Sequence, residues 1–236
     1  MHALRTLHTG VPGPCALIGA SGGLMTRIGI LGGSMQGIVC GHRILDILPD
    51  ADLHLIHEPA EMGLIGEGPG VFASWPLVPG HWVSGLGEQA PDETSTAVRR
   101  SWLEKAMATS LSFRGCTIHL RTRITDHEED GNVSFVGAGP LGEGTIRFDR
   151  TMDALDREPS IVWEGGVFFP TEKKNIENSG NRSDGSVEVW WRETPPITPT
   201  WIQRMSWAGE DPKSSLLDDI NEGILAADRL VDTIIQ

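Results

Sequence analysis

The residues with the clearest chemical signature form a glycine turn near the start of the chain, and an acidic residue follows it. The turn runs from Gly32 to Gly37, and Glu58 comes 21 residues after Gly37. Glycines let backbone amides approach a phosphate closely, and the start of a helix favours negative charge. A carboxylate at the later position can accept hydrogen bonds from ribose hydroxyls. The pattern predicts dinucleotide binding by Gly32, Gly33, Ser34, Met35, Gln36, Gly37 and Glu58.

Three elements must position these residues. An apolar run over residues 27–31 predicts a strand, residues 38–48 have helical spacing, and residues 52–56 predict a second strand. This order is typical of a βαβ dinucleotide-binding unit. Ser34 stands where the pattern G-x-G-x-x-G has its second glycine, and its hydroxyl can add a donor to a phosphate. The alternative is a βαβ unit with a glycine turn and no ligand.

Composition limits the class of protein. The chain has 236 residues, 39% of them hydrophobic and 22% charged, which is ordinary for a globular protein of one large or two small domains. A net charge of −13 without a basic stripe argues against nucleic-acid binding. Cys15, Cys40 and Cys116 have no metal-ligand spacing, so we expect reduced thiols, no metal site and a cytoplasmic location.

The apolar runs of the sequence are too short to predict a membrane protein. No apolar run approaches the ~20 residues that a membrane-spanning helix needs, so no membrane span is predicted. Residues 1–24 are interrupted by glycine and proline, and Met25 stands directly before the first strand. We therefore expect residues 1–24 to be a flexible leader, or to follow from an upstream start that is not the natural one, and their removal should leave cofactor binding intact.

The middle of the chain predicts a loop, a helix and several strands. Residues 59–91 are rich in glycine and proline; they could bring the amides of residues 64–70 against a ligand, or form a surface loop over Trp75 and Trp82. Residues 95–113 have helical spacing, and strands are expected at 116–120, 132–136 and 144–148. Residues 137–142 also spell G-x-G-x-x-G, but a strand follows them, so they predict a hairpin loop without phosphate binding.

From here the order of elements resembles the FAD-dependent oxidoreductases of the glutathione reductase and aromatic hydroxylase type, a group that includes flavin halogenases and amine oxidases. The resemblance rests on the glycine turn, Glu58, an R-x-x-L motif at residues 100–103 and an apolar run ending in Asp153-Ala154. It implies an α/β, Rossmann-like FAD/NAD(P)-binding domain with a central parallel sheet and a β-hairpin or meander insertion. It also implies that Arg100 lies against the flavin nucleotide; the alternative is a solvated helix charge.

The C-terminal region carries the second part of the resemblance. Trp207-Ala208-Gly209-Glu210 precedes a helix with an apolar stripe, which is similar to the second FAD motif of this group. The resemblance implies that Gly209 and Glu210 contact the ribityl chain. It further implies that the amides around Asn221 and Gly223 form a helix start facing the isoalloxazine ring.

Residues 155–199 depart from the longer members of the group. Strands are expected at 160–169 and 186–191, with a mobile loop over 171–185. The expected division is a Rossmann-like domain of residues 25–154 and 200–236, with residues 155–199 as a small β-sheet on the substrate side. Its tryptophans could form an aromatic wall for an apolar substrate or the core of the small sheet: Trp163, Trp190, Trp191 and Trp201.

The sequence as a whole predicts an FAD-dependent oxidoreductase of the monooxygenase type that acts on a small organic substrate. Two alternatives remain, an NAD(P)-binding enzyme without flavin and a catalytically silent relic of a flavoprotein. Glu58 disfavours the 2′-phosphate of NADP. Halogenation is not expected, since the W-x-W-x-I-P signature of the halogenases is missing. The sequence identifies neither a catalytic residue nor an oligomeric state.

Overall fold

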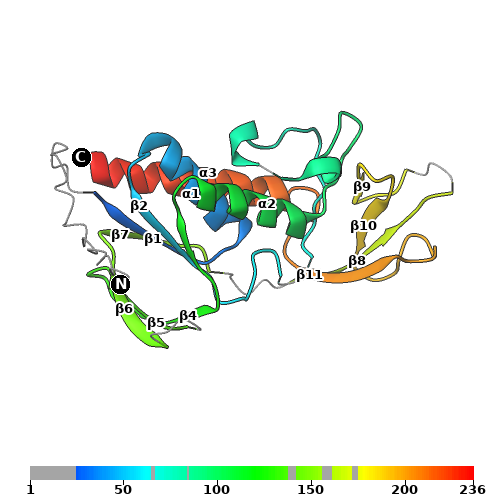
Figure 1. Cartoon of the computed structure of the whole chain (residues 1–236). Coiled ribbons are helices and arrows are strands. Elements are labelled where there is room, and N and C mark those ends of the chain that lie inside the picture. The colour runs from blue at the N-terminus through cyan, green and yellow to red at the C-terminus, as the bar shows by residue number, and fades with distance from the viewer. Residues whose placement is uncertain (1–24, 65–66, 84, 138–141, 156–160, 172–174) are drawn as a thin grey trace, which may run out of the picture.

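The computed structural model describes residues 25–236 except residues 65–66, 84, 138–141, 156–160 and 172–174. The predicted leader, residues 1–24, and most of the predicted hairpin loop at 137–142 therefore lie outside the described residues. The described part contains one parallel sheet, two antiparallel sheets and three α-helices (Figure 1).

The parallel sheet is the centre of the first part of the chain. Its strands are β1 (Arg27–Leu31), β2 (Asp52–Ile56), β3 (Thr117–His119) and β7 (Arg150–Asp153), in the order β3-β2-β1-β7. β1 pairs in parallel with β2 and β7, and β2 pairs in parallel with β3. The inner strand β1 is buried from Ile28 to Leu31 because both faces of the sheet are covered. The predicted βαβ unit is confirmed.

The helices gather on one side of this sheet (Figure 1): α1 (Met35–Ile47), α2 (Arg100–Phe113) and α3 (Ser215–Ile235). α1 packs closely on α3, and its buried face includes Ile38 and Val39. Gly223 makes this close approach possible, because a Cβ there would lie 2.6 Å from the carbonyl oxygen of Gln36. The C-terminal helix is therefore tied to the first helix of the chain.

A three-stranded antiparallel meander covers the other face of the parallel sheet. It consists of β4 (Thr122–His127), β5 (Asn132–Gly137) and β6 (Glu143–Arg147), in the order β4-β5-β6. Val133 and Phe148 pack with Leu31 and Ile56 in a small core between the two sheets. The strand pair β5 and β6 was expected. β4 was not, because most of its side chains are exposed and give no apolar alternation.

A second antiparallel sheet lies at one end of the molecule (Figure 1). Its strands are β8 (Val162–Phe168), β9 (Ser179–Asn181), β10 (Val187–Trp191) and β11 (Gln203–Ala208), in the order β11-β8-β10-β9. The expected antiparallel pair of β8 and β10 is confirmed. β9 lies inside the segment predicted to be a mobile loop, so that prediction is wrong at residues 179–181. The division of the chain into domains stays a prediction, since β11 pairs with β8 whereas α3 packs on α1.

The tryptophans of this sheet lie on two faces. Trp190 packs with Trp163 and Trp207 on one face, and Trp191 packs with Trp201 on the other. The interpretation as one aromatic wall is therefore wrong, and these side chains form the two cores of the small sheet.

The loop before α2 differs from the predicted helix. Ala97 forms an antiparallel bridge with Val71, and Val98 N donates to Gly70 O, so this segment is extended and α2 begins only at Arg100. The short 3-10 helices η1 (Gly80–Trp82) and η2 (Gly87–Gln89) lie in the preceding loop. Trp82 is buried beneath this loop and donates its Nε1 hydrogen to Asp46, as the surface-loop interpretation expected.

Candidate functional site

A cleft of about 840 Å³ opens at the carboxyl ends of β1, β2 and β7. This volume lies in the ~300–1,000 Å³ range of small-molecule and cofactor sites, and the carboxyl edge of a parallel sheet is where such sites usually form. The cleft joins segments that are distant in sequence: the glycine turn, the end of β2, the start of α2, strand β4 and the end of β11. Its polar lining residues include Ser34, His57, Glu58, Glu67, Arg100, Glu104, Arg123, Asp126, His127 and Ser206.

The glycine turn closes against the end of β7. Gly32 has φ +117°, and a Cβ there would lie 2.4 Å from the carbonyl oxygen of Ala154. A side chain at this position would be strained by the backbone conformation and blocked by Ala154. Gly37 packs just as tightly, because a Cβ there would lie 2.3 Å from Gly32 O. These two glycines serve the turn itself and the approach of α1 to the sheet.

Ser34 caps α1. Its Oγ accepts a hydrogen bond from Gly37 N at 3.4 Å and donates to Ala154 O at 3.1 Å. The hydroxyl hydrogen is therefore directed at Ala154 O in this structure, and the role of Ser34 as a donor to a phosphate stays a prediction. The first helical bond is Ile38 N to Ser34 O, which leaves the amides of Met35 and Gln36 without intrahelical acceptors. These amides are the helix-start donors near the cleft.

Glu58 and His57 lie on the neighbouring strand end. Glu58 is exposed directly after β2 and lines the cleft. His57 lies beside Gly33, where a Cβ would be 2.6 Å from His57 Nδ1 and 2.7 Å from Met62 Cε. Gly33 therefore makes room for the His57 ring at the floor of the cleft.

Arg100 is a buried cation that lines the cleft. It is 7% exposed, and its Nε donates to Glu104 Oε1 at 3.0 Å while its Nη2 pairs with Asp219 at the start of α3. Its Nη1 is buried and has no hydrogen-bond partner among the described residues. A buried donor without an acceptor is costly, so this atom favours an acceptor from a ligand. The alternative interpretation, a solvated helix charge, is wrong.

The charges around Arg100 depend on one another. Burial alone would lower the pKa of Arg100, but the carboxylates of Glu104 and Asp219 outweigh it and raise that pKa. Burial also raises the pKa of Glu104, against the opposing effect of Arg100. The Arg100 guanidinium therefore stays charged, while Glu104 is easier to protonate than an exposed glutamate.

The loop before α2 reaches the cleft at Glu67 and Gly68. Glu67 accepts hydrogen bonds from Arg99 Nε at 2.7 Å and from Ser101 Oγ at 2.8 Å. A Cβ on Gly68 would lie 3.0 Å from Arg100 Cδ, so this loop packs against the arginine side chain. The segment predicted to approach a ligand thus lines the cleft at these two residues; residues 65–66 lie outside the described part of the chain.

Five of the predicted site residues line the cleft, and the other predicted residues do not. Gly32, Gly33, Ser34, Glu58 and Arg100 line the cleft. Ser206 to Ala208 of β11 line it as well, whereas Gly209 and the exposed Glu210 follow just outside this lining.

The predicted helix start at Asn221 and Gly223 is wrong. α3 begins at Ser215, so these two residues lie in the interior of the helix, where backbone amides donate to carbonyls four residues earlier. Asn221 is exposed, and Gly223 packs on α1.

Sequence reasoning missed several lining residues. Glu104 was overlooked because a single acidic residue in a helix gives no chemical signal, and Asp126 and His127 lie on the unpredicted strand β4. The sequence placed Trp207 in the motif that precedes the C-terminal helix, but it did not predict that Trp207 lines the cleft. Only the tertiary structure places these side chains at the ends of β1 and β2.

These features fit a dinucleotide. The cleft has the required size, the glycine turn and the helix-start amides lie at one side, and Arg100 Nη1 is a buried donor without a partner in the described residues. Within the described part of the chain, no group of three or more His, Cys, Asp or Glu residues could hold a metal ion. No helix there is long and apolar enough to cross a membrane.

Comparison with known proteins identifies the fold. No protein-family model and no curated protein matches the sequence. Among solved structures, a flavoprotein/dehydrogenase from Cytophaga hutchinsonii matches with a TM-score of 0.57 at 9% identity, over 89% of this chain and 78% of that one. The p-nitrophenol 4-monooxygenase PnpA from Pseudomonas putida DLL-E4 matches with a TM-score of 0.54 at 9% identity, over 89% and 81%.

A third structure, CabE, is an aromatic hydroxylase from angucycline biosynthesis. It matches with a TM-score of 0.52 at 12% identity, over 88% of this chain and 63% of CabE. The chain thus spans less than two thirds of the length of CabE. Taken together, the three similarities show that the chain shares the mixed α/β fold of these three proteins, a flavoprotein/dehydrogenase, a monooxygenase and an aromatic hydroxylase.

Proposed function

We propose that the chain binds FAD in the cleft at the carboxyl edge of the parallel sheet and acts as a flavin-dependent oxidoreductase. The observation that carries the proposal is the convergence of the glycine turn, Glu58 and Arg100 on one cleft in a protein with this fold. The activities of PnpA, a p-nitrophenol 4-monooxygenase, and of CabE, an aromatic hydroxylase, favour chemistry of the monooxygenase type on a small organic substrate.

Each group of residues has a task in this proposal. The glycine turn and the amides of Met35 and Gln36 hold the pyrophosphate, because free N–H groups at a helix start favour anions. Glu58 accepts from the ribose of the adenosine half. The Nη1 atom of Arg100 donates to an oxygen of the nucleotide. Gly209 and Glu210, just beyond the cleft lining, reach the ribityl chain.

When bound, FAD supplies hydride and oxygen chemistry that no side chain can supply. The protein orients the cofactor and excludes water. Trp207 and Ala208 of β11 form an apolar side of the cleft, which suits an uncharged organic substrate better than a strongly charged one.

The first test is the colour and flavin content of the purified protein, followed by titration of the apoprotein with FAD and with NAD. We expect the purified protein to be yellow, and we expect the apoprotein to bind FAD but not NAD. Glu58→Gln should weaken FAD binding by about tenfold, which corresponds to the loss of one charged hydrogen bond. Glu61→Gln is the matched control, since Glu61 is exposed and pairs only with Lys105 outside the cleft.

Two outcomes would replace the proposal. Binding of NAD without FAD would make the protein a dinucleotide-binding enzyme of another class. Binding of FAD without enzymatic oxidation of NADH or NADPH would leave a catalytically silent relic.

A further inference from the structure

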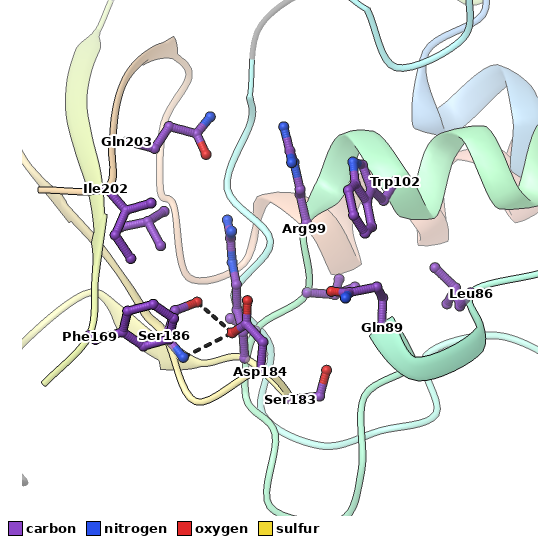
Figure 2. Close-up of a pocket in the computed structure, with 14 residues that line it drawn as sticks. Leu86, Gln89, Arg99, Trp102, Phe169, Ser183, Asp184, Ser186, Ile202 and Gln203 are labelled. Carbon is purple, nitrogen blue, oxygen red and sulfur yellow. Dashed lines mark hydrogen bonds between the residues drawn. The ribbon is translucent and has the colours of Figure 1, made fainter.

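A second, smaller pocket lies between the start of α2, η2 and the antiparallel sheet of β8 to β11 (Figure 2). Its volume is about 220 Å³. Among the described residues, none lines both this pocket and the cleft at the carboxyl edge of the parallel sheet. The volume is below the ~300–1,000 Å³ of pockets that hold drug-sized ligands, so it suits a ligand of about one ring.

Large apolar side chains line this pocket on two sides. Trp102 is 41% exposed, Phe169 is 61% exposed and Ile202 is 57% exposed, and all three line the pocket. Trp102 comes from α2, Phe169 directly follows β8 and Ile202 directly precedes β11, so the fold brings large exposed apolar side chains from distant segments to two sides of one pocket, with Arg99 between them in the view of Figure 2. An aromatic ring can cover these surfaces and remove them from water.

Two arginines, Arg99 and Arg182, line the pocket between these apolar side chains. Each forms an ion pair that uses some of its guanidinium nitrogens and leaves others without an acceptor. Arg99 binds Glu67 Oε1 through Nε at 2.7 Å, and its guanidinium carbon lies 5.0 Å from the centre of the Trp102 ring. Arg182 binds Glu188 Oε2 through Nη2 at 2.6 Å and through Nε at 3.2 Å. Among the described residues, no acceptor bonds to Arg182 Nη1 or to either Nη atom of Arg99.

Arg182 is a built part of the fold and not a mobile surface charge. Its side chain is 9% exposed, and its partner Glu188 is fully buried. Glu188 also accepts from Gly70 N and Trp190 Nε1, both at 2.8 Å. This network holds Arg182 in place, so its remaining donor is pre-organised for an acceptor.

We propose that this pocket binds a small aromatic carboxylate. The carboxylate accepts from the free terminal nitrogens of Arg99 and Arg182, and the ring lies between Trp102 on one side and Phe169 and Ile202 on the other. Asp184 limits the ligand to one negative charge, because its carboxylate lines the same pocket and is held there by Ser186 N at 2.9 Å and Ser186 Oγ at 2.6 Å (Figure 2). A second carboxylate on the ligand would lie near this charge.

The proposal does not depend on the proposed function of the cleft. In the described part of the chain, an ion pair joins the two linings, between Arg99 of the pocket and Glu67 of the cleft. Binding to the pocket can therefore be measured whether or not the protein holds FAD.

The test is calorimetric titration of the full-length protein with four probes: benzoate, benzyl alcohol, benzylamine and acetate. We expect benzoate to bind about tenfold or more tightly than benzyl alcohol, which has the ring without the charge, and than acetate, which has the charge without the ring. Equal binding of benzoate and benzyl alcohol, or tightest binding of benzylamine, would overturn the proposal.

Two variants locate the site. Ile202→Glu places a carboxylate at the exposed edge of the pocket and should weaken benzoate binding at least tenfold, whereas Val162→Glu is the matched control at a 59% exposed position outside the pocket. Arg99→Gln should weaken benzoate binding about tenfold, with Arg204→Gln as its control, because Arg204 also lies over tryptophan rings but does not line the pocket. Unchanged benzoate binding in both Ile202→Glu and Arg99→Gln would refute this site.

Discussion

Arg100, the first residue of α2, forms an ion pair with Asp219 in the first turns of α3, so residues 119 apart in sequence join at the cleft. The same guanidinium binds Glu104 one turn further along α2. Arg100 thus connects the two helices and also offers its remaining donor, Nη1, to the cleft.

Replacing Arg100 by methionine should destabilise the protein by about 3 kcal/mol, because Glu104, whose side chain is only 15% exposed, loses its cation. Thermal or denaturant unfolding measures this loss. The control is Arg43→Met, which breaks an ion pair between α1 and α3 whose side chains are 38% and 39% exposed, and which should cost about 0–1 kcal/mol. Equal losses in the two variants would contradict the structural role of Arg100.

Gly37→Ala should destabilise the protein by about 1–3 kcal/mol, since its Cβ would lie 2.3 Å from the backbone oxygen of Gly32 and the turn must shift. The shift should also weaken FAD binding, because the same turn forms one side of the cleft. Gly80→Ala is the matched control, as a Cβ there meets no atom within 4 Å. Unfolding curves and FAD titration together check both effects, and a Gly37→Ala variant as stable as Gly80→Ala would show that the turn adapts freely.

Gly223→Ala tests the packing of α3 on α1. A Cβ at this position would lie 2.6 Å from Gln36 O and 2.9 Å from Val39 Cβ, so we expect a loss of about 1–3 kcal/mol in unfolding free energy. FAD affinity of the folded protein should fall less than in Glu58→Gln, because Gly223 does not line the cleft and reaches it through Gln36. Normal stability combined with loss of FAD would instead restore the helix-start role that the sequence suggested.

His42 should make stability depend on pH. It is fully buried and stacks on Trp82 with ring centres 5.3 Å apart. Its Nδ1 accepts from Arg114 at 2.8 Å, so its Nε2 donates to Met107 O at 3.0 Å. Burial lowers the pKa of His42 from 6.5 to about 4; the Met107 carbonyl opposes this shift and Arg114 adds to it.

The folded protein therefore keeps His42 neutral at pH values where the unfolded chain takes up a proton. The contribution of His42 to stability is complete above pH 6.5 and is lost as the pH falls from 6.5 to about 4, by on the order of 3 kcal/mol in total. His42→Gln should lose less stability than the wild type between pH 7 and pH 5 in urea unfolding. Equal losses in the two proteins would contradict this assignment.

The βαβ unit was predictable because its signals are local. β1, α1 and β2 follow from apolar periodicity and from glycines within a short stretch, and the resulting turn carries Gly32, Gly33 and Ser34 to the sheet edge. Arg100 was found only through family resemblance, and its burial could not be read from a sequence in which it follows another arginine.

What failed depends on contacts between distant segments. The start of α2 was misplaced because Ala97 pairs with Val71, and the roles of Asn221 and Gly223 were misread because the first turns of α3 hold Asp219 for Arg100. β4 escaped notice because an exposed strand has no apolar alternation.

The sequence by itself determined the glycine turn, the acidic residue after the second strand and the mixed α/β class, since each arises from neighbouring residues and their periodicity. Only the tertiary structure decided which side chains meet: Glu58, Arg100 and Trp207 at one cleft, and Arg99, Arg182 and Trp102 at another pocket. The reason is physical, because burial and pairing of charges are properties of a folded surface to which segments more than a hundred residues apart contribute together.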